Sequence, residues 1–304
     1  MTYTRFLELF PNNDACLDYL KDKFYPDGTA CPKCGKVSKF HRISGRTAYS
    51  CQFCGHHVYP TAGTIFHKST VSLQYWFYAI YLMSSTRCGI SAKQLEREIG
   101  VTYKTAHRMF KLIRTLLSQD DDPLSGEVEI DETGYGGKPH LGATMRYRKP
   151  GDWSRHNAGQ RWAKANKTSV LGMVERGGRV RAEVVPDRLG PTLQGRVIER
   201  VLPASMIFTD EWKSYTGLRH HFAGHRRIQH RQKVYVRGDV HTNTIEGFFG
   251  LLKTGIRGVY HAVSREYLQS YLDEYAWRYN HRHDSQPMFW TILDGVQKDR
   301  LAAS

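Results

Sequence analysis

Long apolar runs, a signal-peptide pattern in the opening residues and abundant cysteine are all missing from these 304 residues. Its apolar runs stay short of the roughly 18 residues that a membrane-spanning helix requires, so we predict no transmembrane segment. The opening residues, MTYTRFLELFPNND, lack the basic and then apolar pattern of a secretory signal peptide. Repeats and low-complexity tracts are also missing, and six cysteines are too few for a disulfide scaffold. We therefore expect a folded protein in a reducing, intracellular setting.

Acidic residues are scarce relative to basic ones. The chain has 29 Asp and Glu against 44 Lys and Arg, which gives a formal net charge of +15 with histidine neutral. Hydrophobic and charged fractions of 40% and 24% are ordinary for a folded protein. The basic surplus therefore predicts a polyanionic partner, most often nucleic acid. A basic surface without a specific partner is the alternative. The length is enough for about two domains.

Most of the cysteines come in two C-x-x-C pairs, CPKC at 31–34 and CQFC at 51–54. The 16 residues between the pairs, and the glycine after each pair, fit a four-cysteine zinc site. Four thiolates around one Zn²⁺ make a closed, tetrahedral, structural centre. A redox-active dithiol is the alternative. We predict a zinc ribbon over 31–66, with the ligands Cys31, Cys34, Cys51 and Cys54.

Helical periodicity flanks this block, in an N-terminal segment over 1–30 and in a longer region over 72–117. In the second region Ser91 and Thr102 are candidate helix caps, and Gly100 marks a turn between two helices. This is the layout of a helix-turn-helix, whose second helix enters the major groove of DNA. An ordinary helical hairpin is the alternative. The residues predicted to face DNA are Tyr103, Lys104, His107 and Arg108.

An acidic, turn-rich linker at 118–126 precedes a second domain, predicted over 126–285. Its elements follow the order strand, strand, strand, helix, strand, strand, helix, helix, which predicts a mixed α/β architecture. The fifth strand is expected at KVYVRG, 233–238. Residues 286–304 are predicted to form a C-terminal tail. A basic insertion at 138–167 carries further residues predicted to bind DNA, which are Arg146, Arg148 and Lys149.

Three acidic residues stand at the ends of predicted elements. Asp131 follows the strand EVEI, Asp210 ends the strand SMIFT, and Glu246 lies in the first turn of NTIEGFFGLLKTG. In an RNase H-like sheet the first and fourth strands are neighbours, so the three carboxylates would converge. Carboxylate oxygens suit Mg²⁺, and two such ions about 3.5–4 Å apart stabilise both reacting oxygens of a phosphodiester transfer. Glu132 and Glu211 are predicted to point elsewhere, because side chains alternate along a strand.

Several segments together resemble the bacterial insertion-sequence transposases of the DDE superfamily that carry an N-terminal zinc ribbon. The segments are CPKC…CQFC, GEVEIDETGYGGK, IFTDEWKSY, HTNTIEGFFGLLKTGIRGVYHAVS and YLDEYAWRYNHR, so the resemblance runs from Cys31 to about Arg282. It implies an RNase H-like catalytic domain in which Asp131, Asp210 and Glu246 bind Mg²⁺ or Mn²⁺. It also implies cleavage at element ends and joining of a DNA 3′-hydroxyl to target DNA.

The resemblance implies further features of the protein. Lys253, two turns beyond Glu246 on the same helical face, would contact a DNA phosphate. The expected partners are the terminal inverted repeats of the element and the target DNA. Because two ends are cut and joined, we expect a homodimer or a larger assembly on DNA. A cytoplasmic location, associated with the bacterial nucleoid, follows from the same resemblance.

The sequence leaves the role of Glu246 open. Asn243 and Glu246 stand three residues apart, as an N-cap and its N3 partner do, so the carboxylate could serve only to cap a helix. Some related sequences carry an Asn as the third ligand, which makes Asn243 the alternative to Glu246. A charged oxygen suits Mg²⁺ better and favours Glu246.

Two other functions compete with a transposase. An RNase H-like nuclease would cut DNA without joining it, and the same acids would serve. A non-catalytic zinc-ribbon regulator would bind DNA through the N-terminal regions alone, but it would leave the whole region after the linker unexplained.

Overall fold

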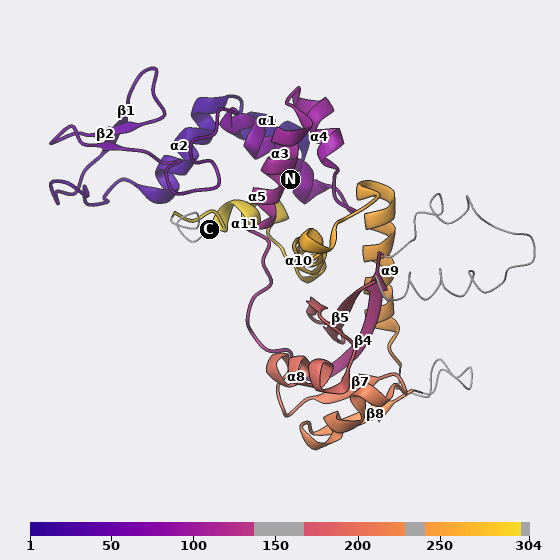
Figure 1. The fold of residues 1–304 in the computed structure, drawn as a ribbon. Helices are drawn as coiled ribbons and strands as arrows, with labels where there is room; N and C mark the ends of the chain where they lie inside the picture. The colour runs from indigo at the N-terminus through magenta and orange to yellow at the C-terminus, as the bar shows by residue number, and fades with distance from the viewer. Residues whose placement is uncertain (137–166, 229–240, 299–304) are drawn as a thin grey trace, which may run out of the picture. The chain divides into compact units, whose positions relative to one another are not determined.

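The computed structural model describes residues 1–136, 167–228 and 241–298, and the chain divides into two compact units (Figure 1). The first unit comprises residues 1–117 and 284–304, and the second comprises residues 118–283. In the segments described, none of the helices combines the length and the apolar character that crossing a membrane requires.

The first unit contains a small antiparallel sheet and a group of helices. The sheet has three strands in the order β1-β2-β3, which are β1 (Phe40–Arg42), β2 (Tyr49–Cys51) and β3 (His57–Val58). The helices are α1 (Tyr3–Leu9), α2 (Asn13–Phe24), α3 (Leu73–Ser85), α4 (Ala92–Ile99), α5 (Tyr103–Arg114) and α11 (Met288–Asp294).

Aromatic side chains form much of the helical core of this unit. Phe10, which ends α1, packs edge-to-face on Phe77 of α3, with ring centroids 4.9 Å apart. Phe289 of α11 lies 5.8 Å from the same Phe10 ring and is buried. The stretch 286–304, predicted as a tail, therefore differs from that prediction. It supplies a helix to the N-terminal unit, because the apolar residues of α11 are covered only in this core.

α4 and α5 begin and end where the sequence predicts. The Ser91 hydroxyl accepts the amide of Gln94 at 3.1 Å, and the Thr102 hydroxyl accepts that of Thr105 at 3.3 Å. Gly100 ends α4 with a φ of 69°, a left-handed conformation that favours glycine. Each cap satisfies an amide that the helix itself cannot. The two helices pack against each other, and α5 also packs on α3.

A five-stranded mixed sheet forms the centre of the second unit. Its order is β6-β5-β4-β7-β8, with antiparallel pairs on the β6 side and parallel pairs from β4 to β8. The first and fourth strands are therefore neighbours, as predicted. The strands are β4 (Glu127–Tyr135), β5 (Thr168–Glu175), β6 (Val180–Val185), β7 (Met206–Thr209) and β8 (Gly224–Arg227).

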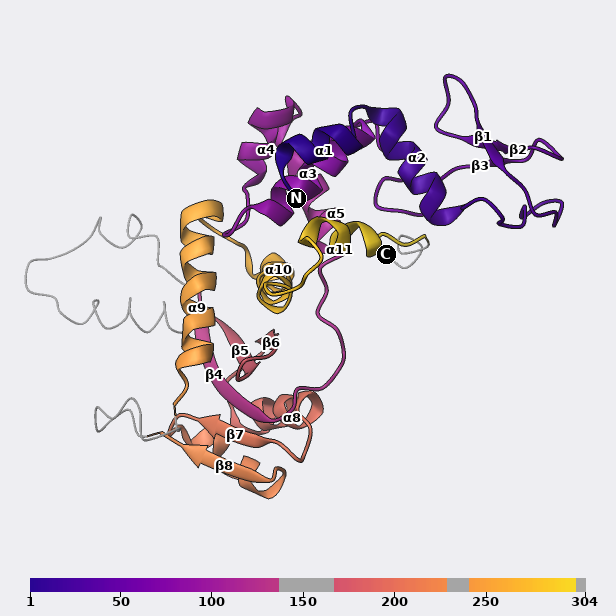
Figure 2. The ribbon, with the colours of Figure 1, turned by 180° about the vertical axis from the view of Figure 1, so that it is seen from behind.

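Helices cover both faces of this sheet (Figures 1 and 2). On one face, α9 (Asn243–Gly255) and α10 (Leu268–Asn280) pack with Val170 and Val174 of β5. On the other face, α8 (Gly190–Arg200) and the 3-10 helix η2 (Lys213–His220) pack with Leu171 and Met173. Successive side chains of β5 thus enter opposite layers. Two short turns, η4 (Ile256–Tyr260) and η5 (Arg265–Tyr267), connect α9 to α10.

The sheet contains a strand that the sequence did not predict. The predicted segment KVYVRG, 233–238, lies outside the described residues and stays a prediction, and the fifth strand of the sheet within the described residues is β8, with the sequence GHRR. β8 lies at the edge of the sheet and its side chains are half-buried or exposed. It therefore lacks the alternating apolar pattern by which a strand is recognised in sequence.

Side-chain amides cover the outer edge of β6. Gln119 accepts the amide of Ala182 at 3.0 Å and donates to its carbonyl at 2.8 Å. Asn280 does the same for Val180, at 2.7 and 3.1 Å. Backbone groups that a further strand would otherwise pair are thus satisfied. Because Gln119 lies in the predicted linker 118–126, that segment is part of the second unit, and the boundary falls at its start.

Candidate functional site

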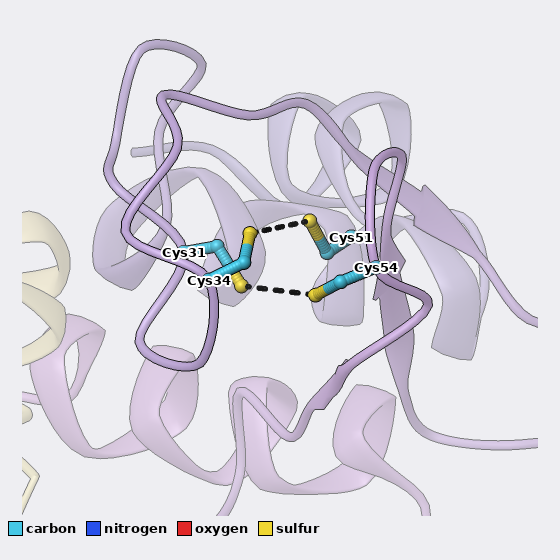
Figure 3. A group of neighbouring side chains, drawn as sticks. All are labelled: Cys31, Cys34, Cys51 and Cys54. Atoms are coloured by element: carbon cyan, nitrogen blue, oxygen red, sulfur yellow. Dashed lines mark hydrogen bonds between the residues drawn. The ribbon is translucent and has the colours of Figure 1, made fainter.

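The four cysteines predicted to bind zinc lie together on two facing loops (Figure 3). The sulfurs of Cys31 and Cys54 are 3.7 Å apart, those of Cys34 and Cys51 are 3.9 Å apart, and all four lie within 4.8 Å of one another. Four sulfurs about 2.3 Å from one Zn²⁺ would lie about 3.8 Å apart at the corners of a tetrahedron. The cluster therefore has the ligands and the spacing of a structural zinc centre.

Hydrogen bonds set the ionisation of these thiols. Burial opposes ionisation of Cys51, but the Ser38 hydroxyl, 3.1 Å from the sulfur, and backbone amides of the same loop lower its pKa to about 6. The pKa of Cys54 moves the other way, to about 11, because burial and the neighbouring thiols outweigh the amide of His56. Ionisation of one thiol disfavours ionisation of its neighbours, because like charges repel. The thiolate is the form that binds a metal ion.

Two of the three predicted acids lie side by side on neighbouring parallel strands. Glu129 of β4 is paired with Phe208 of β7. The same register two residues further on brings Asp131 level with Asp210, directly after the end of β7. Glu129 and Asp131 alternate with Ile130, which packs in the α8 layer, so both acids face the α9 layer.

The helix α9 brings Glu246 to this same face. Gly172 is the partner of Asp131 on β5, and a Cβ added to it would lie 2.6 Å from the Phe249 ring and 2.7 Å from Ile245. Only glycine therefore lets α9 approach the sheet this closely. Glu246 directly follows Ile245 and is exposed.

Electrostatic interactions connect the three carboxylates. Burial raises the pKa of Asp131 to about 6, and the charges of Asp210 and Glu246 add to this rise against the opposing effects of the Glu132 amide and Lys253. In the part of the chain that the structure describes, only the four cysteines form a group whose ligand atoms all lie within 4.8 Å of one another. Carboxylates that share two ions can lie farther apart than the ligands of a single ion, because the two ions are themselves about 3.5–4 Å apart.

Glu132 points into the opposite layer, as the alternation along β4 predicts. The Tyr215 hydroxyl donates to its carboxylate at 2.5 Å, and Tyr215 is buried in the α8 layer. Arg188 lies 3.9 Å from the other carboxylate oxygen. Burial raises the pKa of Glu132 to about 7. Its contacts are those of a core residue.

The start of α9 does not form the capping box. Thr242 occupies the N-cap position, and Asn243 is the first helical residue. The Thr242 hydroxyl donates to Glu246 at 3.0 Å. Asn243 is therefore not the N-cap, and the interpretation of Glu246 as its N3 partner is wrong. The side chains of Asn243 and Glu246 are both exposed and lie one helical turn apart on α9. The choice of Glu246 as the third ligand therefore stays a prediction.

The sequence analysis missed the residue that caps α9. The first amides of the helix bond the carboxylate of Glu129, at 2.8 Å from Thr244 and 3.2 Å from Ile245. Glu129 is 0% exposed. The sequence offered one signal for this role, since Glu129 is a charged residue between the apolar Val128 and Ile130. Its partners on α9 could not be predicted, because they lie more than a hundred residues further along the chain.

Lys253 lies within electrostatic range of Asp131, and further basic side chains lie near Lys253. The pKa of Lys253 is lowered, because burial and the charges of Arg257, Lys167 and Arg188 outweigh the attraction of Asp131. Lys253 is thus in electrostatic range of both the acid and three other cations. Lys167 is the one residue of the predicted basic insertion that is described. The predicted DNA-binding residues Arg146, Arg148 and Lys149 lie outside the described residues.

The residues of α5 predicted to meet DNA lie on its outer side. Tyr103, Lys104 and Arg108 are exposed, and His107 is half-buried. The Tyr103 and His107 rings are 6.0 Å apart. The intervening Ala106 is buried, so one face of the helix packs and the other is available to a partner.

Comparison with known proteins adds evidence independent of this geometry. Residues 123–280 match the ISXO2-like transposase domain, and residues 11–57 match the transposase zinc-ribbon domain. An uncharacterized protein in transposable element ISH50 of Halobacterium salinarum is 29% identical over 255 residues, covering 81% of this chain and 83% of that protein. An uncharacterized transposase-like protein of Haemophilus influenzae is 29% identical over 102 residues, covering 34% and 81%.

One solved structure is also similar in part. It is a simian T-cell lymphotropic virus intasome in complex with PP2A regulatory subunit B56 gamma, with 16% identity over 70% of this chain and 73% of that chain. Its TM-score of 0.33 is too low to carry an argument. The domain match alone spans more than half of the 304 residues. The resemblance inferred from the motifs is thus confirmed, and the chain belongs to the family with the ISXO2-like transposase domain.

Proposed function

We propose that this protein is a DNA transposase that binds element ends, cleaves them and joins their 3′-hydroxyls to target DNA. The catalytic domain would be RNase H-like, and the reaction a two-metal-ion phosphodiester transfer. The observation that carries the proposal is the convergence of Asp131, Asp210 and Glu246 from two strands and a helix. The raised pKa of Asp131 supports it, because burial causes most of the rise and the charges of both other acids add to it.

The donor set fits the metal that this chemistry needs. Asp131, Asp210 and Glu246 offer hard carboxylate oxygens, which suit Mg²⁺ or Mn²⁺. Bound there, the ions would supply activation of the attacking oxygen and stabilisation of the leaving one. Glu132 would stay outside the set, since its carboxylate bonds Tyr215 in the opposite layer.

The chain's own cations would hold the DNA beside these acids. Lys253 is in electrostatic range of Asp131, and Arg257, Lys167 and Arg188 are in electrostatic range of Lys253. Phosphate contacts fix the register of DNA on a protein and stabilise it largely through charge. Lys253 would place the phosphate next to Asp131. Because the lysine side chain is partly buried, few side-chain conformations would be open to it.

The first unit would supply recognition of the element ends. One Zn²⁺ held by the four cysteines would stabilise the ribbon, and the exposed side of α5 would enter the major groove. A homodimer or larger assembly on DNA would hold two ends at once.

A strand-transfer assay tests the proposal and decides the third ligand. Purified protein is incubated with Mg²⁺ or Mn²⁺ and DNA carrying the element end, comparing wild type with Glu246→Gln and Asn243→Ala. We expect joining to be lost in Glu246→Gln alone, in protein that still folds and binds DNA. Joining that survives in Glu246→Gln but not in Asn243→Ala would make Asn243 the ligand.

The same assay separates the two competing functions. Nicked ends without joined products in the wild type would indicate an RNase H-like nuclease. Binding of the ends without any cleavage, in either metal, would indicate a regulator. Glu211→Gln is the matched control, because it removes the carboxylate directly after Asp210 and should leave joining unchanged.

A further inference from the structure

Glu129 is a buried carboxylate beside the acid site that the proposed reaction does not use. It lies two residues before Asp131 on the same face of β4 and is 0% exposed. A buried charge is costly unless it is paired and hydrogen-bonded. Its partners therefore indicate what it contributes.

One set of partners belongs to the first turn of α9. Oε2 of Glu129 accepts the amides of Thr244 and Ile245 at 2.8 and 3.2 Å, and Oε1 accepts the Thr244 hydroxyl at 3.0 Å. Such amides have no partner within a helix, and negative charge is favourable at a helix N-terminus. These two residues directly precede Glu246, so the bonds fix the backbone that carries it.

The second partner is Arg176. Its Nε donates to Oε1 of Glu129 at 2.8 Å, and its guanidinium carbon lies 3.9 Å from the centre of the Phe208 ring. Phe208 is in β7, two residues before Asp210. Arg176 also donates to the carbonyl of His241, directly ahead of α9, at 3.0 Å. The His241 ring nitrogen lies 3.0 Å from Glu129 but outside hydrogen-bonding geometry, so no role is assigned to it.

We propose that Glu129, with Arg176, is a positioning residue that holds the three acid-bearing elements in register. The pair contacts β4, β7 and α9, in each case within two residues of the acid that the element carries. A small displacement of α9 along β4 would move Glu246 relative to Asp131. This inference rests on the proposed function, because it assigns Glu129 a role toward the carboxylates of that site.

The test compares Glu129→Gln with Glu127→Gln. Glu127 is the matched control, since it lies on the same strand and bonds Nη1 of the same Arg176 at 3.1 Å, but its side chain is 54% exposed. Three quantities are measured: hydrogen exchange of the first amides of α9 in metal-free protein, Mn²⁺ affinity by electron paramagnetic resonance, and strand-transfer turnover. Asp131→Asn provides the reference for a lost ligand.

We expect Glu129→Gln to lose about tenfold or more in Mn²⁺ affinity and in turnover, as residues that orient metal ligands commonly do. Exchange at Thr244 and Ile245 should accelerate several-fold, because a neutral amide bonds them less strongly. DNA affinity should stay within about twofold, since no phosphate-binding residue is removed. Glu127→Gln should match the wild type in all three measurements.

Three outcomes would count against the inference. Unchanged exchange in Glu129→Gln overturns it, and so does faster exchange with unchanged Mn²⁺ affinity. Equal losses in Glu127→Gln also overturn it, because they would show that the effect does not depend on the buried carboxylate of Glu129. If the wild type joins no ends, the proposed function fails instead, and the exchange and Mn²⁺ measurements still decide the positioning role.

A second pair of variants covers the case in which Glu129→Gln does not fold. Thr244→Val removes the hydroxyl that bonds Oε1 while keeping the shape of the side chain, and Thr244→Ser retains that hydroxyl. We expect weaker Mn²⁺ binding and faster exchange in Thr244→Val than in Thr244→Ser. Equal values for the two variants would overturn the inference.

Discussion

The two candidate metal sites of this protein are built in opposite ways. The cysteine cluster is formed within residues 31–54, and its geometry is set by two tight loops and their own hydrogen bonds. The acids come from β4, β7 and α9, which are far apart in the sequence. In the site proposed here, their convergence would depend on strand register, on the close approach of α9 over Gly172, and on the buried Glu129 that contacts the start of α9.

This difference predicts which substitutions matter for each site. A local cluster depends on its ligands and on little else in the chain. A dispersed set depends on every contact that fixes one element against another, so it is sensitive to core residues that touch no metal and no DNA. The predictions below separate these two kinds of dependence, starting from the largest expected effect.

Asp131→Asn should abolish the acid site while leaving the cysteine site intact. The change keeps the size of the side chain but removes a charged ligand from a two-ion centre, so strand transfer should fall about a thousandfold or more. Joining rate, zinc content and far-UV circular dichroism are measured on the same preparation. Asp210→Asn should behave alike, and Glu211→Gln should not. Substantial joining by Asp131→Asn would remove this carboxylate from the metal site.

Zinc removal should do the reverse. The sheet β1–β3 has very short strands, so the ribbon should unfold when a chelator removes the ion or when Cys34→Ser removes a ligand. Affinity for the element ends should fall about tenfold or more, because metal binding and folding of such ribbons are linked. Cys88→Ser, outside the cluster, is the control. Equal DNA affinity before and after chelation, measured by titration, would separate the ribbon from end recognition.

Gly172→Ala tests the dependence of the acid site on core packing. The added methyl would meet the Phe249 and Ile245 side chains at under 3 Å, so these side chains, and α9 with them where they cannot give way, must shift away from β5. Such overpacking should cost about 2–3 kcal/mol in the free energy of unfolding, and joining should fall with it although no ligand is altered. Gly195→Ala on α8 is the control, because its methyl would enter open space and should stabilise the helix slightly.

A thermal melt and a joining assay of the two glycine variants decide the matter. If Gly172→Ala folds and joins like wild type, the approach of α9 to the sheet does not limit the site. Zinc content should stay unchanged in both variants, since neither substitution lies in the first unit.

The same difference explains what the sequence alone could predict. C-x-x-C spacing defines a zinc cluster because the ligands are close in sequence, and the caps Ser91 and Thr102 are visible for the same reason. The apolar runs of β5 and β7 place strands correctly, since burial on both faces of the sheet requires those residues wherever they occur. The acids are far apart in sequence and could be proposed only from the order of the elements and from the family resemblance.

Features that depend on distant partners were not predictable. β8 reads GHRR and is a strand only because β7 lies beside it. The apolar residues of α11 are too few to mark a helix of the N-terminal unit until Phe10 covers them. Glu129 resembles any charged residue in a strand, and its role becomes visible only when the amides of Thr244 and Ile245 lie against it.

The smallest expected effect concerns pH. The pKa of Asp131 is raised to about 6 from an ordinary value of 3.8, so the folded unit binds this proton more tightly than the unfolded chain does. The stabilisation from protonated Asp131 is therefore complete below about pH 4 and is lost as pH rises through about 6. In metal-free protein at pH 7, Asp131→Asn should be about 1–2 kcal/mol more stable than wild type, after allowance for solvent screening.

Melting curves at pH 4 and pH 7 test this, because the two proteins should differ only at the higher pH. Glu132 also titrates with a raised pKa of about 7, to which burial and then the charge of Asp131 contribute, so removing that charge favours ionised Glu132 and adds to the difference at pH 7 in the same direction. Mn²⁺ should stabilise the wild type at pH 7 and have little effect on Asp131→Asn. A buried carboxylate that destabilises the fold until a cation binds is then distinguished from a cysteine cluster whose hydrogen bonds already favour one thiolate. Equal stabilities at pH 7 would mean that neither burial nor the charges of Asp210 and Glu246 oppose ionisation of Asp131, and would count against a shared metal site.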